Sequence, residues 1–415
     1  TLAKLPARQF PHCAPITSGL KFNAMGSGVS KKAWGRRFHI TSNVPEPEGD
    51  TYQQIFPVWT IAVTKNQRQL ATATSDNRIN LWCLVTHQLL APLIGHADTI
   101  WRLAYSPDDL LLASTSADGT VRLWEVSTGL PVMILPRNHA NWVWSLAWSP
   151  DGSRLATGGS DARILIWDAQ EAADGAQRVQ ELSARAAVDP SWAQTAAEEA
   201  EKASQLAQPL TFWQAHEKSI HDLFFAPSES KMLVSCGAEG SIAVWDADSG
   251  NLDCRLMGHI GTVTTVAICP TNSELLATGG EDHTVRLWDL RDIEPSSQLA
   301  RMSREKVNGI NLAHFTLKGH EGGVSRVRFT GDGQLLASVS KDCTCRVWIP
   351  SLFNPLLLAK FIAHEAWIRD VSWAPDQKSL YTAGSDGMVF AWEVPAKYHA
   401  QIQKGRGSGS RKYKA

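Results

Sequence analysis

Tryptophan recurs along this 415-residue chain at a nearly constant spacing, and each copy ends a short apolar phrase such as Val-Arg-Leu-Trp or Ile-Leu-Ile-Trp. Successive copies are separated by 42, 43, 78, 43, 60 and 44 residues. A period near 43 indicates a repeat architecture, in which each repeat is one small unit that packs against the next. The copies are Trp82, Trp124, Trp167, Trp245, Trp288, Trp348 and Trp392.

The stretch from 95 to 125 shows what one repeat contains. Residues 100–105, 111–114 and 121–124 are apolar or alternate between apolar and polar, which predicts three short strands. Ser-Pro-Asp at 106–108 and Ala-Asp-Gly at 117–119 predict the turns between them. A fourth strand fits before the next Gly-His pair. Four strands in about 43 residues is the period of a β-propeller blade.

With Gly-His near the start of the unit and Trp-Asp at 167–168, 245–246 and 288–289, the repeats resemble WD40 repeats over about residues 38–394. The resemblance implies an all-β chain with a single seven-bladed propeller at 37–394. A basic extension at 1–36 would precede it and a basic tail at 395–415 would follow it. In this family the last blade usually takes its outermost strand from the N-terminal side, and residues 37–41 are the best candidate for that strand.

The resemblance also implies a structural tetrad in each blade, made of a His, an Asp six residues before the Trp, a Ser or Thr, and the Trp. Recurrence in every repeat favours a structural role that satisfies buried polar groups over catalysis. Two blades depart, with Glu239 in the Asp position beside His216 and Trp245, and with Gln54 in the His position of the first blade. The complete sets are His96/Asp118/Trp124, His139/Asp161/Trp167, His259/Asp282/Trp288, His320/Asp342/Trp348 and His364/Asp386/Trp392.

Two long gaps between repeats mark insertions at 170–209 and 291–313, which in this family would leave the bottom face. The first is rich in Ala, Glu and Gln, and Asp189-Pro190 predicts the start of a helix at 191, with 170–186 a candidate second helix. Such a helical insertion would either dock a partner or be a tolerated surface feature. The second insertion mixes charges of both signs and predicts a solvated loop.

The net charge of −1 hides two basic ends. Residues 1–45 hold seven Lys or Arg and residues 394–415 hold six, and neither stretch contains an acid. Such tails can contact RNA or an acidic protein surface, or can simply be solvated. The acid-free N-terminal stretch also fits an organellar address. No apolar run predicts a membrane span or a secretion signal.

The seven cysteines are scattered without a Cys-x-x-Cys pair, which argues against disulfides and zinc and favours a reducing compartment. The expected location is therefore intracellular, in the cytoplasm or nucleus, with an organelle as the alternative. The Cys343-x-Cys345 pair predicts a strand with both thiols on one face, in the core or wall rather than on a metal.

In this family the residue five positions after the repeat His lines the top mouth of the central channel. Trp142 and Trp367, two positions earlier, would face the same rim. An aromatic arc of this kind would bind a partner through an apolar anchor or a cation–π contact, or would only plug the channel. The seven residues at the fifth position are Trp59, Trp101, Trp144, His221, Thr264, Ser325 and Arg369.

Residues 276–291 also resemble the Trp-Asp-x-Arg box of ubiquitin-ligase substrate receptors, which makes Asp289 and Arg291 candidate adaptor contacts. No phosphate-binding loop, metalloprotease motif or nucleophile elbow is present, so we expect no enzyme, cofactor, metal or small-molecule substrate. The leading hypothesis is a non-catalytic scaffold that holds protein partners in a multi-subunit assembly. The alternatives are a ribonucleoprotein component with RNA-binding tails and a substrate receptor of a cullin-RING ubiquitin ligase.

Overall fold

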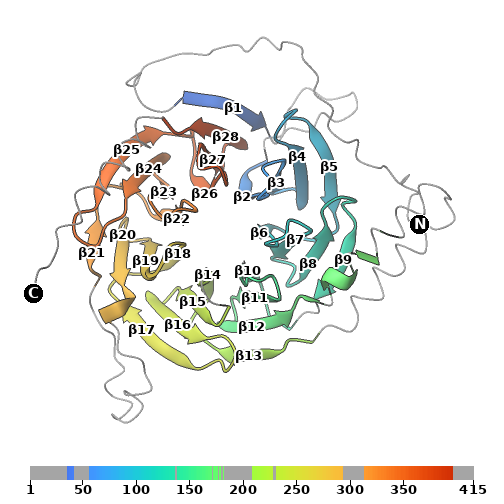
Figure 1. Ribbon diagram of the computed structural model, residues 1–415, viewed down its shortest axis with the longest axis horizontal. Helices are drawn as coiled ribbons and strands as arrows, with labels where there is room; N and C mark the ends of the chain where they lie inside the picture. Colours follow the sequence, from blue (N-terminus) through green and yellow to red (C-terminus); the bar gives the residue numbers. More distant parts are fainter. Residues whose placement is uncertain are drawn as a thin grey trace, which may run out of the picture.

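The computed structural model describes residues 35–41, 56–135, 138–170, 172–175, 177–178, 181, 208–227, 230–292 and 313–395. Within them, seven four-stranded antiparallel sheets surround a central axis, as Figure 1 shows. The innermost strand of each sheet lies next to the axis and the outermost strand lies at the rim. The predicted all-β, seven-bladed propeller is confirmed.

The first four blades follow the chain in order, each running from the axis outward. Their strands are β2 (Val58–Val63), β3 (Gln69–Thr74), β4 (Arg78–Cys83), β5 (Leu89–Ile94), β6 (Ile100–Tyr105), β7 (Leu111–Ser116), β8 (Val121–Glu125), β9 (Pro131–Leu135), β10 (Val143–Trp148), β11 (Arg154–Gly159), β12 (Arg163–Asp168), β13 (Thr211–Gln214), β14 (Ile220–Phe225), β15 (Met232–Gly237), β16 (Ser241–Asp246) and β17 (Leu252–Met257).

The last three blades complete the ring. Their strands are β18 (Val263–Cys269), β19 (Asn272–Gly280), β20 (Val285–Asp289), β21 (Phe315–Leu317), β22 (Val324–Phe329), β23 (Leu336–Ser340), β24 (Thr344–Ile349), β25 (Leu356–Ile362), β26 (Ile368–Trp373), β27 (Ser379–Gly384), β28 (Met388–Glu393) and β1 (Gly35–Thr41).

The ring is closed by β1, which contains the predicted strand at 37–41. It pairs antiparallel with β28 and forms the outer edge of the seventh blade, although the two strands lie at opposite ends of the sequence. Ile40 lies opposite Val389 and is buried in a core cluster with Tyr381. This pairing gives the seventh blade its fourth strand and ties the N-terminal side of the ring to the C-terminal side.

The turn before the third strand has the same backbone geometry in every blade. The residue that follows the tetrad acid has a positive φ in all seven, yet only three blades place glycine there. Cys343 occupies this position with a φ of 62°, ahead of β24, whereas Cys345 is fully buried within the strand. The prediction of two thiols on one strand face is therefore wrong, because strand alternation does not extend into a left-handed turn.

The innermost strand of every blade contains a β-bulge at one equivalent position. In the second blade Ile100 pairs with Ser116 and Arg102 pairs with Thr115, so the innermost strand contains one extra residue between these pairs. The same shift occurs in the six other blades. The extra residue is the one five positions after the repeat His. Bulges re-aim a side chain out of the regular alternation of the strand, and all seven residues occupy such a position.

Both insertions connect the third and fourth strands of a blade, between β12 and β13 and between β20 and β21. The first begins with helical residues at 170, 172–175 and 177–178, and Ala172 is buried in the core cluster that contains Val132 of the preceding blade. The second begins with the short 3-10 helix η1 (Leu290–Asp292). The predicted helix from 191, the loop from 293 to 312, residues 1–34 of the basic N-terminal extension and residues 396–415 of the basic tail lie outside the described residues.

Candidate functional site

The tetrad of the second blade shows how each repeat is held together. His96 Nδ1 lies 2.9 Å from Asp118 Oδ2, His96 Nε2 lies 2.8 Å from Ser114 Oγ, and Trp124 Nε1 donates to the same hydroxyl over 2.9 Å. The same connections occur around His139, His259, His320 and His364. In each of these blades one network therefore joins the second and third strands, the turn between them and the loop before the first strand.

The tetrad environment fixes the charge of its members. Burial opposes ionisation of Asp118 and Asp342, but hydrogen bonds from the tetrad histidine, a threonine hydroxyl and backbone N–H groups hold the pKa of each carboxyl below its usual 3.8. Burial lowers the pKa of His96 and His320 below 6.5, and the neighbouring aspartate offsets this only in part. Because both pKa values are lowered, the aspartate is ionised and the histidine is neutral, and the histidine donates its Nδ1–H to the aspartate.

The fourth blade keeps the network with a longer acid. Glu239 hydrogen-bonds His216 Nδ1 and accepts from Ser241, while Trp245 Nε1 donates to Ser235 Oγ over 2.8 Å. Burial opposes ionisation of Glu239, but these hydrogen bonds lower its pKa to about 2. Gly237 provides the room, because a Cβ there would lie 2.4 Å from Glu239 Oε2. In the first blade Trp82 donates to Thr72, and Gln54 lies outside the described residues.

The bulge residues of five consecutive blades around the ring form one continuous layer, which we call the aromatic arc. It runs from Arg369 through Trp59, Trp101 and Trp144 to His221. The Arg369 guanidinium carbon lies 4.2 Å from the centroid of Trp59, and the ring centroids along the arc are then 4.9, 4.4 and 5.6 Å apart. The bulge at Trp59 shows that its alignment with the other blades is correct without reference to Gln54.

Two further rings extend the arc to the surface. Trp142 packs 5.5 Å from Trp144 and is 48% exposed, while Trp367 lies 5.0 Å from the Arg369 guanidinium and is 46% exposed. The indole N–H groups of Trp59, Trp101 and Trp144 are buried and have no hydrogen-bond acceptor among the described residues. The other two bulge residues, Thr264 and Ser325, lie outside the arc, and Thr264 donates to the carbonyl of Gly279.

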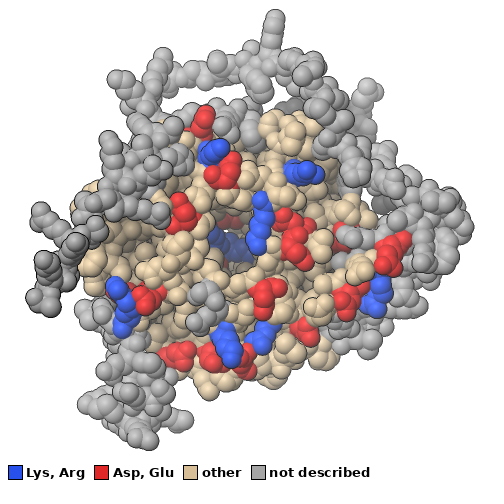
Figure 2. All heavy atoms as spheres, in the orientation of Figure 1, with Lys and Arg blue, Asp and Glu red and all other residues tan. Residues whose placement is uncertain are grey.

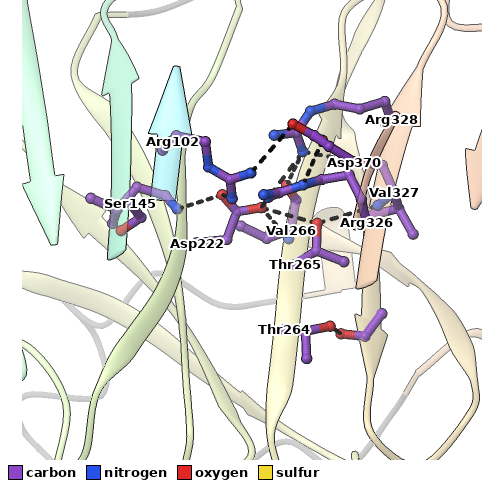
Figure 3. Close-up of polar contacts among 12 residues, drawn as sticks. Arg102, Ser145, Asp222, Thr264, Thr265, Val266, Arg326, Val327, Arg328 and Asp370 are labelled. Carbon is purple, nitrogen blue, oxygen red and sulfur yellow. Dashed lines mark hydrogen bonds and ion pairs between the residues drawn. The ribbon is translucent and has the colours of Figure 1, made fainter. Parts of the chain in front are cut away.

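A second layer, next to the aromatic arc, was not predicted. The residue after each bulge is polar and buried in all seven blades. We call this set the charged layer, and Figure 3 shows four of its members, Arg102, Asp222, Arg326 and Asp370, meeting in the channel. Its residues are Thr60, Arg102, Ser145, Asp222, Thr265, Arg326 and Asp370.

Two ion pairs join blades that are not neighbours in the sequence. Arg102 NH2 donates to Asp222 Oδ1 over 2.9 Å, and Arg326 NH1 donates to Asp222 Oδ2 over 2.7 Å. Arg326 Nε also donates to Asp370 over 3.1 Å, and Asp370 accepts from Thr60. The signal available in the sequence was a polar residue six positions after each repeat His, within strands that are otherwise mostly apolar.

The candidate ligase-adaptor contacts lie apart from the channel, at the start of the second insertion. Arg291 Nε and NH2 donate to Asp289 over 3.0 and 2.6 Å, and Arg291 also pairs with Glu274 at 3.3 Å. The Arg291 side chain is 51% exposed, whereas Asp289 is nearly buried. The hydrogen bond from Arg291 is the main cause of the lowered pKa of Asp289.

Figure 2 shows a hollow at the centre of the ring, with basic side chains inside it and charges of both signs around it. In the described part of the chain, no group of three or more His, Cys, Asp and Glu side chains is placed to bind a metal ion. No helix within these residues has the length and apolarity needed to span a bilayer.

Comparison with known families adds to this geometry. The family described as "WD domain, G-beta repeat" matches seven segments that together make up more than half of the chain: 51–83, 87–125, 129–168, 207–246, 250–289, 313–348 and 356–393. This chain belongs to the WD40 family. Each matched segment ends at the repeat Trp or the residue after it, in register with the third strand of a blade.

Individual relatives match this WD40 protein over part of its length. It is 29% identical over 190 residues to nuclear distribution protein PAC1 of Arthroderma benhamiae, covering 44% of this chain and 37% of the relative. It is 26% identical to protein hir1 of Schizosaccharomyces pombe, covering 43% and 20%, and 26% identical to a component of chromatin assembly factor 1 from Mus musculus, covering 40% and 30%. The chain thus spans well under half the length of these relatives.

Proposed function

We propose that this WD40 protein is a non-catalytic scaffold that holds protein partners in a larger assembly, and that one partner docks on the aromatic arc. The family supports this, since propellers present several separate faces to partners, and the names of the relatives refer to nuclear distribution and chromatin assembly. A fold alone does not identify a function. The particular residues of the arc carry the proposal.

The decisive observation is that the arc reaches the surface at two places, through Trp367 beside Arg369 and through Trp142 beside Trp144. Trp142 and Trp367 are about half exposed, although each packs on a more buried member of the arc. Exposed tryptophan next to arginine is typical of the residues that contribute most to protein interfaces.

The chain's own cations restrict what the arc can bind. Arg369 stacks on Trp59 and also contacts Trp367, and Lys341 Nζ lies 5.2 Å from the centroid of Trp367. Cation–π positions at this end of the arc are therefore already occupied. We propose that the partner supplies an apolar or aromatic anchor instead of a lysine or arginine.

The experiment compares the Trp142→Ala/Trp367→Ala double variant with the wild type by native purification and mass spectrometry. Both rings are half exposed, so we expect the melting temperature to change by less than about 2 °C while at least one partner is lost. Phe353→Ala is the matched control, because this aromatic residue is 85% exposed but lies outside the arc. An unchanged set of partners in the double variant would contradict docking on the arc.

The second candidate function is that of a ubiquitin-ligase substrate receptor, and the position of Arg291 supports it. Asp289 holds the Arg291 guanidinium at a fixed surface position, as an adaptor contact would need. Arg291→Ala should then release a cullin adaptor from the purified complex, whereas Lys231→Ala, which removes another exposed cation, should retain it.

The RNA alternative rests on tails outside the described residues, and no observation of the structure favours it.

We also propose an intracellular location, in the cytoplasm or nucleus. Cys236, Cys254 and Cys345 carry free thiols inside the blades, which fits a reducing compartment. Fluorescence microscopy of a tagged full chain tests the location.

A further inference from the structure

The charged layer and the arginine beside it contain more positive than negative charge. Arg102 and Arg326 belong to the layer, and Arg328 reaches it from β22, with NH1 3.5 Å from Asp222 Oδ2. Three guanidinium groups therefore share the two carboxylates of Asp222 and Asp370. Among the described residues, Cys236 and His221 also interact with Arg102. Burial strongly raises the pKa of the Cys236 thiol and lowers the pKa of His221, so both favour the neutral form. The cluster carries one uncompensated positive charge, which is costly in a buried position.

Two of these arginines also have N–H groups to spare. Arg102 Nε and NH1 have no hydrogen-bond acceptor within the described part of the chain, and the nearest carboxylate oxygen of Asp370 is 4.0 Å from NH1. Every polar contact of the Arg328 side chain with described residues uses NH1, which donates to the carbonyls of Val327 at 2.9 Å and Val266 at 3.3 Å. Its Nε and NH2 groups are left available, and the edge of a guanidinium binds oxyanions in a bidentate manner.

Arg328 can be reached from solvent. Its side chain is 24% exposed, against 5% for Arg102 and 7% for Arg326. Four blades have alanine at the equivalent position eight residues after the repeat His position, which is too short to cross the channel: Ala62, Ala104, Ala147 and Ala267. Figure 2 shows basic side chains inside the central hollow, and Figure 3 shows Arg328 among the residues around the Asp222 carboxylate.

We propose that the central channel contains an anion site, in which Arg328 binds a small oxyanion, a phosphate or a carboxylate, beside Arg102. The anion neutralises the excess positive charge of the cluster and accepts hydrogen bonds from the Nε and NH2 groups of Arg328. Phe224 covers one face of the guanidinium, with its centroid 5.7 Å away, and leaves the edge as the binding surface. The site is separate from the aromatic arc and does not depend on a protein partner.

The test is thermal unfolding of the full chain in sodium phosphate, sodium acetate and sodium chloride at equal ionic strength. A millimolar site gives a rise in melting temperature of about 3 °C in about 10 mM phosphate relative to chloride. The Arg328→Gln variant should lose this rise, while Arg68→Gln, an exposed arginine in the turn between β2 and β3, should keep it. The measurement in acetate distinguishes a carboxylate ligand from a phosphate ligand. A site for carboxylates raises the melting temperature in acetate, whereas a site for phosphate raises it in phosphate alone.

The same melting temperature in all three salts overturns the proposal, and so does an equal phosphate response in Arg328→Gln. If that variant does not fold, Arg328→Lys is used instead, because lysine keeps the positive charge but cannot donate two parallel hydrogen bonds as the guanidinium does. Calorimetric titration with phosphate should then show affinity reduced about 5-fold or more relative to the wild type. An unchanged affinity would exclude Arg328 as the ligand.

Discussion

Asp222 is the residue through which most of the charged layer is connected. Its carboxylate accepts from Arg102, Arg326, Thr265 and the Val266 backbone N–H, which belong to three other blades. Asp222→Asn should lower the free energy of unfolding by about 3–5 kcal/mol, because removal of one partner leaves buried guanidinium groups uncompensated. Urea unfolding of the purified chain measures this.

Asp248 offers the matched control for that substitution. It pairs with Arg154 and with Lys231 at 3.4 Å, but its side chain is 36% exposed. Asp248→Asn should cost no more than about 1 kcal/mol, because water screens an exposed pair. Equal costs for the two substitutions would show that the charged layer contributes no more than a surface salt bridge.

At the scale of single elements, β1 has the largest expected effect because it closes the ring. Removal of the chain up to and including β1 should lower the melting temperature by about 10 °C or more, since β28 then presents an unpaired edge and the core around Ile40 opens. Scanning calorimetry measures the shift. A melting temperature within about 2 °C of the wild type would contradict closure by β1.

A point substitution separates the packing of β1 from its hydrogen bonding. Ile40→Ala should cost about 2–4 kcal/mol through the cavity it leaves, and Ile40→Val about 1 kcal/mol.

The first insertion, unlike β1, contacts two blades. It follows β12 of the third blade, but its Ala172 packs in the core cluster that also contains residues of the second blade.

At the scale of the whole molecule, the repeated tetrads couple stability to pH. The folded state lowers the pKa of the tetrad carboxyls below 3.8, so their contribution is complete above that value and is lost as the pH falls through the folded pKa. The lowered pKa values of His96 and His320 add a loss that starts below pH 6.5. Stability should fall gently from pH 6.5 to 4 and steeply below.

The urea midpoint at pH 7.5, 5 and 3 measures this dependence, with a contribution on the order of 1 kcal/mol from each tetrad. Asp118→Asn should reduce the loss below pH 4, because one titrating carboxyl is gone. A midpoint that stays constant from pH 7.5 to 3 would show that the tetrads are not the acid-sensitive groups.

Seven blades, their turns and the tetrad positions could be predicted from the sequence, because each depends on contacts within about 45 residues and recurs in phase. The aromatic residues at the channel mouth could also be placed, through their fixed distance from the repeat His. Whether they touch was decided only by the fold, since seven β-bulges turn them toward one axis. The charged layer needed the closed ring altogether. Arg102 and Arg326 reach Asp222 from 120 and 104 residues away. No local pattern reports a contact of that range, because it exists only once all blades surround the same channel.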